Sequence, residues 1–145
     1  MSINLRNVSA ADDEIIYSIT DSAMREHVEK IFGPWIEDYQ RKLIKEKIDR
    51  NTYRIIQLDG VDVGLIVVEN EECCIRLSSI FLLPMAQNKG IGTQLLHELQ
   101  LKASRQNLPL RVRVLACNPA RFWYQREGFV TTEKTPERWF MEWKR

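Results

Sequence analysis

Residues 81–96 read FLLPMAQNKGIGTQLL, and this stretch is the starting point for interpreting the whole chain. An apolar run ends at Pro84, and an amphipathic helical pattern begins at Gly90. A tight turn between them needs one glycine, yet Gly90 and Gly92 stand two residues apart at the start of the helix. Because glycine has no Cβ, the pair indicates that a ligand approaches the backbone there. The free N–H groups and partial positive charge of a helix start suit a phosphate.

Two well-known phosphate loops do not match this stretch. A dinucleotide-binding loop of the form G-x-G-x-x-G needs a third glycine where Leu95 stands. In a Walker A loop the lysine follows its glycine, whereas Lys89 precedes Gly90. Taken alone, the G-x-G spacing is equally compatible with a glycine-rich turn that binds nothing.

The bulk properties set limits on the protein class. The 145 residues are most simply one domain, residues 1–145. With 21 basic and 20 acidic residues, the net charge of +1 gives no reason to expect nucleic acid or an anionic membrane as partner. The N-terminus lacks a signal-peptide pattern, and no apolar stretch reaches the roughly 20 residues of a membrane span. We therefore expect a cytoplasmic protein.

The cysteines and histidines do not form a metal-binding or disulfide pattern. Cys73 and Cys74 are adjacent, Cys117 is distant, and no C-x-x-C occurs. His97 opens the segment HELQL, but the second histidine of an H-E-x-x-H motif would fall at Leu101. We expect no metal site.

The hydrophobic periodicity predicts a strand, two helices, three strands, a helix, a strand, a helix and two strands. This order is typical of an α+β domain with a mixed, mainly antiparallel central sheet flanked by helices. Asp59-Gly60 predicts a two-residue hairpin turn. The predicted elements are residues 3–8, 9–32, 35–49, 52–58, 61–70, 73–83, 90–106, 110–116, 120–127, 129–135 and 138–144.

Two motifs together resemble the GNAT N-acetyltransferase superfamily. Its acyl-CoA-binding segment has Gln or Arg, two residues, Gly, one residue, then Gly or Ala, and Gln87, Gly90 and Gly92 match it in order. Residues 118–129, NPARFWYQREGF, resemble its second motif, an asparagine, a short helix with a tyrosine, and Gly-Phe. The matching residues there are Asn118, Ala120, Tyr124, Gly128 and Phe129. The element order also agrees with a GNAT-like acyl-CoA N-acyltransferase fold, so the resemblance covers essentially the whole chain.

The resemblance implies acetyl-CoA as acetyl donor. By this resemblance, the main-chain N–H groups of residues 87–93 hold the pyrophosphate of coenzyme A. The strand that ends at Leu82 and Leu83 is expected to splay away from the strand of residues 110–116. The pantetheine arm enters the notch like another strand, and Asn118 hydrogen-bonds it from the other side. The expected coenzyme A contacts are Leu82, Leu83, Gln87, Asn88, Lys89, Gly90, Ile91, Gly92, Thr93, Asn118 and Tyr124.

The resemblance further implies direct attack by a primary amine in a ternary complex. The Leu82 backbone N–H polarises the thioester carbonyl, and Tyr124 donates a proton to the departing sulfur. The alternative for Tyr124 is a packing role beside its aromatic neighbours. No general base is assigned, because the strand before the glycine loop carries no carboxylate. A water chain, or an amine that arrives neutral, would be sufficient. Six other residues were considered as the general base but are expected to be solvated surface groups: Glu26, His27, Glu29, Glu69, Glu71 and Glu72.

The acceptor is expected to be a small-molecule or peptide amine. By the resemblance, the two helices after the first strand form one wall of its site. Phe32, Trp35 and Tyr39 are candidates for an aromatic pocket, with Ser78 on the facing strand, although core packing is the alternative for each aromatic. The acidic residues nearby, which would attract a cationic amine, are Glu26, Glu29, Glu37 and Asp38. The segment ERWFMEWKR, residues 137–145, is a candidate for the opposite wall or a homodimer edge.

Two other functions remain open at this point. A non-catalytic acyl-CoA-binding or regulatory module would bind the same ligand without needing Tyr124 as an acid. An oligomerising structural domain would have no affinity for coenzyme A.

Overall fold

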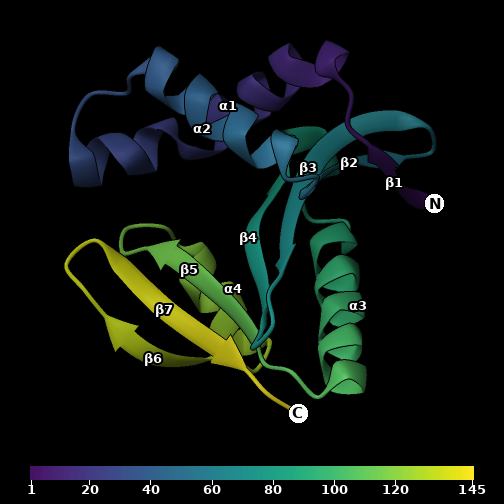
Figure 1. The fold of residues 1–145 in the computed structure, drawn as a ribbon, viewed down its shortest axis with the longest axis vertical. Helices are drawn as coiled ribbons and strands as arrows, with labels where there is room; N and C mark the ends of the chain where they lie inside the picture. Colours follow the sequence, from purple (N-terminus) through teal and green to yellow (C-terminus); the bar gives the residue numbers. More distant parts are fainter.

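A computed structural model describes all 145 residues, and its main elements follow the predicted order (Figure 1). The α+β fold class is confirmed, and two short 3-10 helices, η1 and η2, are additional. The second helix begins at Glu37 and not at residue 35, because Ile36 is still extended after the Gly33-Pro34 break. The bounds are β1 Ile3–Asn7, η1 Ala10–Asp12, α1 Asp13–Phe32, α2 Glu37–Asp49, β2 Tyr53–Leu58, β3 Val61–Asn70, β4 Ile75–Leu82, η2 Pro84–Ala86, α3 Ile91–Gln106, β5 Leu110–Leu115, α4 Ala120–Arg126, β6 Val130–Lys134 and β7 Arg138–Trp143.

All seven strands form one sheet in the order β1-β2-β3-β4-β5-β7-β6. Every neighbouring pair is antiparallel except β4 and β5. The parallel pair is joined over only three residues of each strand, from Ile75↔Leu110 to Leu77↔Val112. Beyond Leu77 the two strands diverge, and Figure 1 shows them close at one end and apart at the other. The predicted splaying of these strands is confirmed.

Helices cover both faces of the sheet. On one face α3 and α4 enclose a core of sixteen buried residues that includes Ile91, Leu96 and Tyr124. On the other face α1 and α2 pack onto β2 and β3 around a second core of nine residues, including Ile16, Ile44 and Leu65. None of the helices combines the length and apolar character that a bilayer span requires.

Local geometry in β3 and β4 follows from a few residues. The predicted turn is confirmed, since Asp59 and Gly60 both have positive φ, 51° and 84°. Gly64 lies opposite Leu82, and a Cβ there would collide with the Phe81 carbonyl oxygen. A bulge interrupts the β3–β4 pairing at Ser78: Val67 pairs with Ser79, whereas Val68 pairs with Leu77. Such a bulge re-aims a side chain, here that of Ser78.

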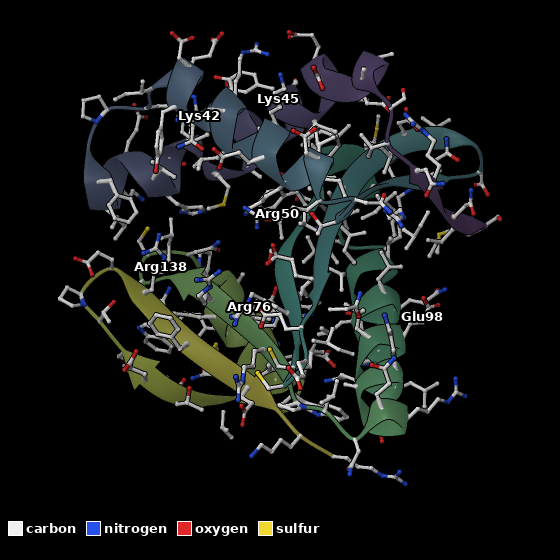
Figure 2. All side chains as sticks on the ribbon, viewed as in Figure 1. Lys42, Lys45, Arg50, Arg76, Glu98 and Arg138 are labelled. Atoms are coloured by element: carbon white, nitrogen blue, oxygen red, sulfur yellow. The ribbon has the colours of Figure 1, made fainter.

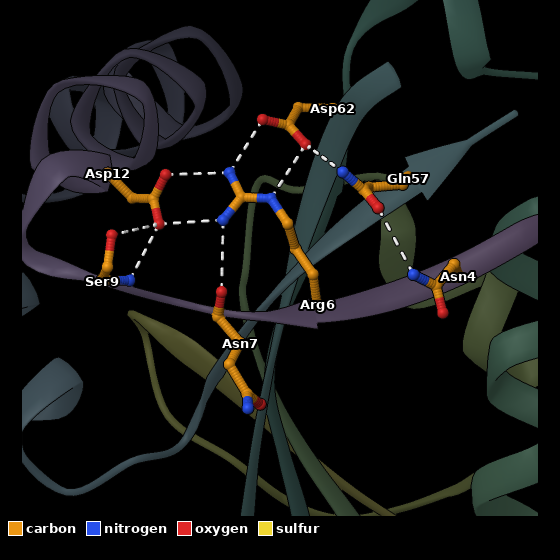
Figure 3. Close-up of polar contacts among 7 residues, drawn as sticks. All are labelled: Asn4, Arg6, Asn7, Ser9, Asp12, Gln57 and Asp62. Carbon is orange, nitrogen blue, oxygen red and sulfur yellow. Dashed lines mark hydrogen bonds and ion pairs between the residues drawn. The ribbon is translucent and has the colours of Figure 1, made fainter. Parts of the chain in front are cut away.

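A polar network ties the start of the helical layer to the sheet (Figure 3). The Arg6 guanidinium on β1 donates to both carboxylate oxygens of Asp12, at 2.8 and 2.9 Å, and to Asp62 on β3. Asp12 also accepts from the Ser9 backbone N–H at 2.8 Å, which fixes the entry into α1. The hydrogen bonds from Arg6, and then that from Ser9, lower the pKa of Asp12 to about 2 despite its burial.

Candidate active site

The glycine loop presents a row of free backbone donors. None of the N–H groups of residues 88–93 has a hydrogen-bond partner within the chain, and the first helical bond of α3 runs from Gln94 to the Gly90 carbonyl. Asn88 and Gly90 adopt left-handed conformations, with φ of 61° and 80°. These conformations turn the chain sharply before α3, so that consecutive N–H groups face outward as an anion-binding nest.

Contacts with the core hold this loop in place. The Gln87 side chain donates to the Leu82 carbonyl at 2.9 Å, and the Gln87 backbone N–H bonds to Pro84. Ile91 is fully buried, so it anchors the start of α3 in the core. A Cβ at Gly90 would meet no atom within 4 Å, which leaves open space in front of the donors. A Cβ at Gly92 would make only ordinary contact with Trp123, so internal packing does not require glycine there.

The end of β4 turns one N–H into the notch. Leu83 donates to the Val63 carbonyl at 2.8 Å, which makes this pair a hydrogen-bonded one. Hydrogen-bonded and non-bonded pairs alternate along an antiparallel ladder. Leu82, paired with Gly64, therefore directs its N–H away from β3 and towards β5. Because β5 has already diverged, this edge of β4 is free to pair with an extended ligand.

Asn118 and Tyr124 come from the opposite side of the notch. The Asn118 Oδ1 accepts the Ala120 N–H at 2.9 Å, whereas its Nδ2 has no partner in the chain. Tyr124 is buried between Trp123 and Phe129, with ring centroids 4.9 and 5.2 Å away. Its hydroxyl makes no hydrogen bond within the chain, and burial raises the pKa of Tyr124 above its usual value. Tyr124 is thus both a packing residue and a protonated donor without a partner.

A cavity of about 710 Å³ adjoins these two residues and extends under the helical layer. It is bounded by α1, α2, β2, β4, β5, α4 and β7, and both Asn118 and Tyr124 line it. No residue of the glycine loop does. The glycine loop therefore lies outside this cavity, whereas Asn118 and Tyr124 line it.

Of the three aromatic residues expected to line the acceptor site, two line the cavity and one is buried in the core. Phe32, Tyr39 and Ser78 line the cavity. Trp35 does not: it is only 9% exposed, and its Nε1 donates to the Tyr17 hydroxyl at 2.8 Å within the second core. For Trp35 the core-packing alternative holds, because the segment after the Gly33-Pro34 break folds back onto α1.

The acidic residues do not lie where a cationic amine would require them. Glu26, Glu29, Glu37 and Asp38 are exposed, and none of the four lines the cavity, so they are not placed to attract a cationic amine into it. Glu69 was expected to be a surface group, but it is partly buried. Its side chain is 17% exposed, accepts a hydrogen bond from the Ser78 hydroxyl at 2.8 Å, and forms an ion pair with Arg50.

Several polar lining residues were not anticipated by the sequence analysis, among them Lys47, Tyr53, Arg113 and Arg138. Desolvation, followed by the charge of Glu69, raises the pKa of Tyr53 to about 12. No local motif marks these residues, since they come from α2, β2, β5 and β7.

Outside the cavity, the remaining candidates make ordinary contacts. All three cysteines are free. His97 pairs with Glu127 at 2.7 Å, and His27 lies 3.8 Å from the Cys117 sulfur. Glu71 accepts from the Cys74 thiol at 2.9 Å and also pairs with Arg76.

Comparison with known proteins gives a consistent result. The family model described as an acetyltransferase (GNAT) domain matches residues 10–143. The fold is similar to that of PaiA N-acetyltransferase from Thermoplasma acidophilum in complex with coenzyme A, with 21% identity, full coverage of both chains and a TM-score of 0.77. An acetyltransferase from Thermus thermophilus gives 16% identity, a TM-score of 0.77 and coverage of 100% of this chain and 98% of that one.

A GNAT family acetyltransferase from Elizabethkingia anophelis with acetyl-CoA bound gives 17% identity, a TM-score of 0.71 and coverage of 99% and 98%. At these identities the structural matches establish the fold. No curated protein is significantly similar in sequence.

Proposed function

We propose that this chain, which belongs to the GNAT acetyltransferase family, transfers an acetyl group from acetyl-CoA to a primary amine. The observation that carries the proposal is the row of unpartnered backbone N–H groups at residues 88–93, beside a notch in the sheet that ends near Tyr124. Helix starts and backbone nests of this kind bind phosphates. Structural relatives described as complexes with coenzyme A or acetyl-CoA add support.

In this proposal, the loop holds the pyrophosphate of the donor through residues 88–93. The free edge of β4 at Leu82 and the Asn118 Nδ2 hold the pantetheine arm from its two sides. Acetyl-CoA supplies an acetyl group activated as a thioester. Both reactants then lie in one cleft, and this proximity supplies much of the rate.

Two groups of the chain act on the reacting atoms. The Leu82 N–H, directed into the notch, donates to the carbonyl oxygen where negative charge develops. Tyr124 stays protonated at neutral pH because burial raises its pKa, and its hydroxyl has no internal partner. It therefore serves as the general acid for the leaving sulfur.

The hydrogen bond from Ser78 to Glu69 offers a path by which the proton of the attacking amine can reach a base. Ser78 lines the cavity at the β4 bulge, and its hydroxyl already donates to the Glu69 carboxylate. The amine proton passes through an intervening water to the Ser78 Oγ while the Ser78 proton passes to Glu69. The carboxylate comes from β3, which is why the sequence of the strand before the loop carries none.

The test is a thiol-release assay with acetyl-CoA and a panel of primary amines, with mass spectrometry of the products. We expect amine-dependent release of coenzyme A and a product that is heavier by one acetyl group. A non-catalytic acyl-CoA-binding module is the competing function. It would bind acetyl-CoA by calorimetry yet release no thiol with any amine, and Tyr124→Phe would leave it unchanged.

A further inference from the structure

The charged side chains that line the cavity are all basic. Four basic residues line it, Lys47, Arg76, Arg113 and Arg138, and no aspartate or glutamate does. The whole chain has a net charge of only +1, so this is a local concentration of positive charge. Figure 2 shows Arg76 and Arg138 on the strands that border the space beneath α1 and α2.

Three of these cations form no direct ion pair in the chain; Arg113 and Arg138 are exposed to solvent and Lys47 is not. Arg76 pairs with Glu71 at 3.2 Å, but Lys47, Arg113 and Arg138 form no ion pair. Lys47 is half-buried on α2, and desolvation lowers its pKa. The charge of Glu69 opposes this shift, whereas the charges of Arg113 and Arg50 also lower the pKa. A partly buried cation without a partner costs free energy, which an anionic ligand would recover.

This charge is distinct from the coenzyme A loop. None of residues 87–93 lines the cavity. Arg76 lies at the closed end of the notch, where β4 and β5 are still neighbouring strands and Arg76 is opposite Arg111 in the sheet. It precedes Leu82 by six positions along β4, which is roughly 20 Å of strand. The cations therefore lie apart from the glycine loop, in the cavity that Asn118 and Tyr124 also line.

The rest of the lining limits the acceptor's size and character. Sixteen of the 26 lining residues are hydrophobic, among them Phe32, Ile36 and Leu43. A cavity of about 710 Å³ is of the size that small molecules occupy in proteins. A dicationic amine would be repelled by three unpaired cations, whereas an anionic group would form charge-assisted hydrogen bonds with them.

We propose that the acceptor is a small amine that also carries a carboxylate or phosphate group, held by Lys47, Arg113 and Arg138 while its amine points towards Ser78. This inference rests on the proposed acetyl transfer and specifies its substrate class. It reverses the expectation of an acidic acceptor pocket, since the acidic residues of α1 and α2 lie outside the cavity.

The experiment compares amines that differ only in the anionic group. Phenylalanine against 2-phenylethylamine tests the carboxylate, and phosphoethanolamine against ethanolamine tests the phosphate. Each compound is assayed for thiol release with acetyl-CoA, and each is titrated by calorimetry into the protein saturated with free coenzyme A. Binding is thus read even where an amine does not react.

The variants are Lys47→Met and Arg113→Gln. Their controls are Lys45→Met on the same helix and Arg105→Gln on α3, both exposed and outside the cavity. We expect at least one anionic member to bind about tenfold or more tightly than its neutral partner, the scale of one or two charge-assisted hydrogen bonds. Lys47→Met and Arg113→Gln should reduce that preference, and the controls should retain it.

Three results would overturn the inference: preference for the neutral members, equal binding within both pairs, or no binding of any anionic member at millimolar concentration. An anionic preference that survives both Lys47→Met and Arg113→Gln would also overturn it. Titration with acetyl-CoA alone separates this outcome from failure of the proposed function. A protein that binds acetyl-CoA and acetylates only the neutral amines keeps the function and loses the anionic acceptor.

Discussion

The two halves of the cleft are built in different ways. The half proposed to bind the acetyl donor is a short loop, residues 87–93, whose free groups are backbone N–H groups next to a helix start. The half proposed to bind the acceptor is a cavity whose charged groups are side chains from α2, β4, β5 and β7. Backbone donors tolerate many side chains provided that the glycine conformations are kept. A cavity lined by side chains can change its ligand with one substitution, so the two halves should respond differently to mutation.

The largest expected effect lies where the halves meet. Tyr124→Phe removes the proton donor and keeps the buried ring between Trp123 and Phe129. We expect kcat to fall by about a hundredfold or more, the usual contribution of a general acid, with little change in the dissociation constant of acetyl-CoA. Steady-state kinetics and calorimetry measure the two quantities. Tyr39→Phe, which changes another cavity tyrosine, serves as the control, and equal losses in both variants would contradict the assignment.

The next effect should be confined to the donor half. Gly90→Val places a β-branched side chain at a φ of 80°, where such residues are strained. The loop should shift and the dissociation constant of acetyl-CoA should rise by at least about tenfold, the equivalent of roughly 1.4 kcal/mol. Gly60→Val has the same strain, at a φ of 84°, in a hairpin remote from the loop. If the two variants bind acetyl-CoA equally well, the loop does not hold it.

A smaller effect should be confined to the acceptor half. Ser78→Ala and Glu69→Gln each interrupt the proposed proton path, so each should lower kcat by about tenfold. Because they act on one path, the double variant should be barely worse than either single one. Ser79→Ala is the control, since Ser79 also lines the cavity. Additive losses in the double variant would mean that the two residues act separately.

The smallest effect concerns the support of the helical layer. Asp12→Asn weakens the bonds from Arg6 that hold the start of α1 (Figure 3). The folded pKa of Asp12, about 2, lies below its ordinary 3.8, so its stabilisation is present above pH 4 and is lost as pH falls towards 2. We expect a loss of about 1–2 kcal/mol in the free energy of unfolding at neutral pH.

Urea unfolding between pH 2 and 7 measures this change. The difference between wild type and Asp12→Asn should shrink as the solution is acidified, because wild-type Asp12 then becomes protonated too. Asp13→Asn, an exposed neighbour in the first turn of α1, should show a smaller difference at neutral pH. A constant difference at all pH values would remove Asp12 ionisation as the cause.

The two halves also differ in how far the sequence predicts them. The turn and helix start at residues 87–93 were predicted from the glycine spacing because both are local, and Gly90 has the positive φ that such a turn uses. Their role in binding coenzyme A was implied by the family resemblance and stays a prediction. The element order followed from periodicity in the same way. The bulge at Ser78 has no local signal, since it is defined by the pairing of β4 with β3.

The acceptor half depends on contacts between distant residues. Phe32 and Trp35 are three positions apart and equally aromatic, yet one lines the cavity and the other is buried against Tyr17. A balanced net charge conceals the fact that Lys47, Arg113 and Arg138 converge. Only the tertiary fold brings these residues together, so the sequence could offer acidic candidates on α1 and α2 but could not reveal the basic residues that line the cavity.

The most direct test is a titration of 15N-labelled protein with free coenzyme A, followed by amide NMR spectra. It examines the claim that backbone N–H groups of residues 88–93 hold the phosphates. We expect the largest chemical-shift changes at these amides and at Leu82, with little change at Gly60 and in β6. Binding that leaves the amides of residues 88–93 unshifted would show that the loop does not hold the phosphates.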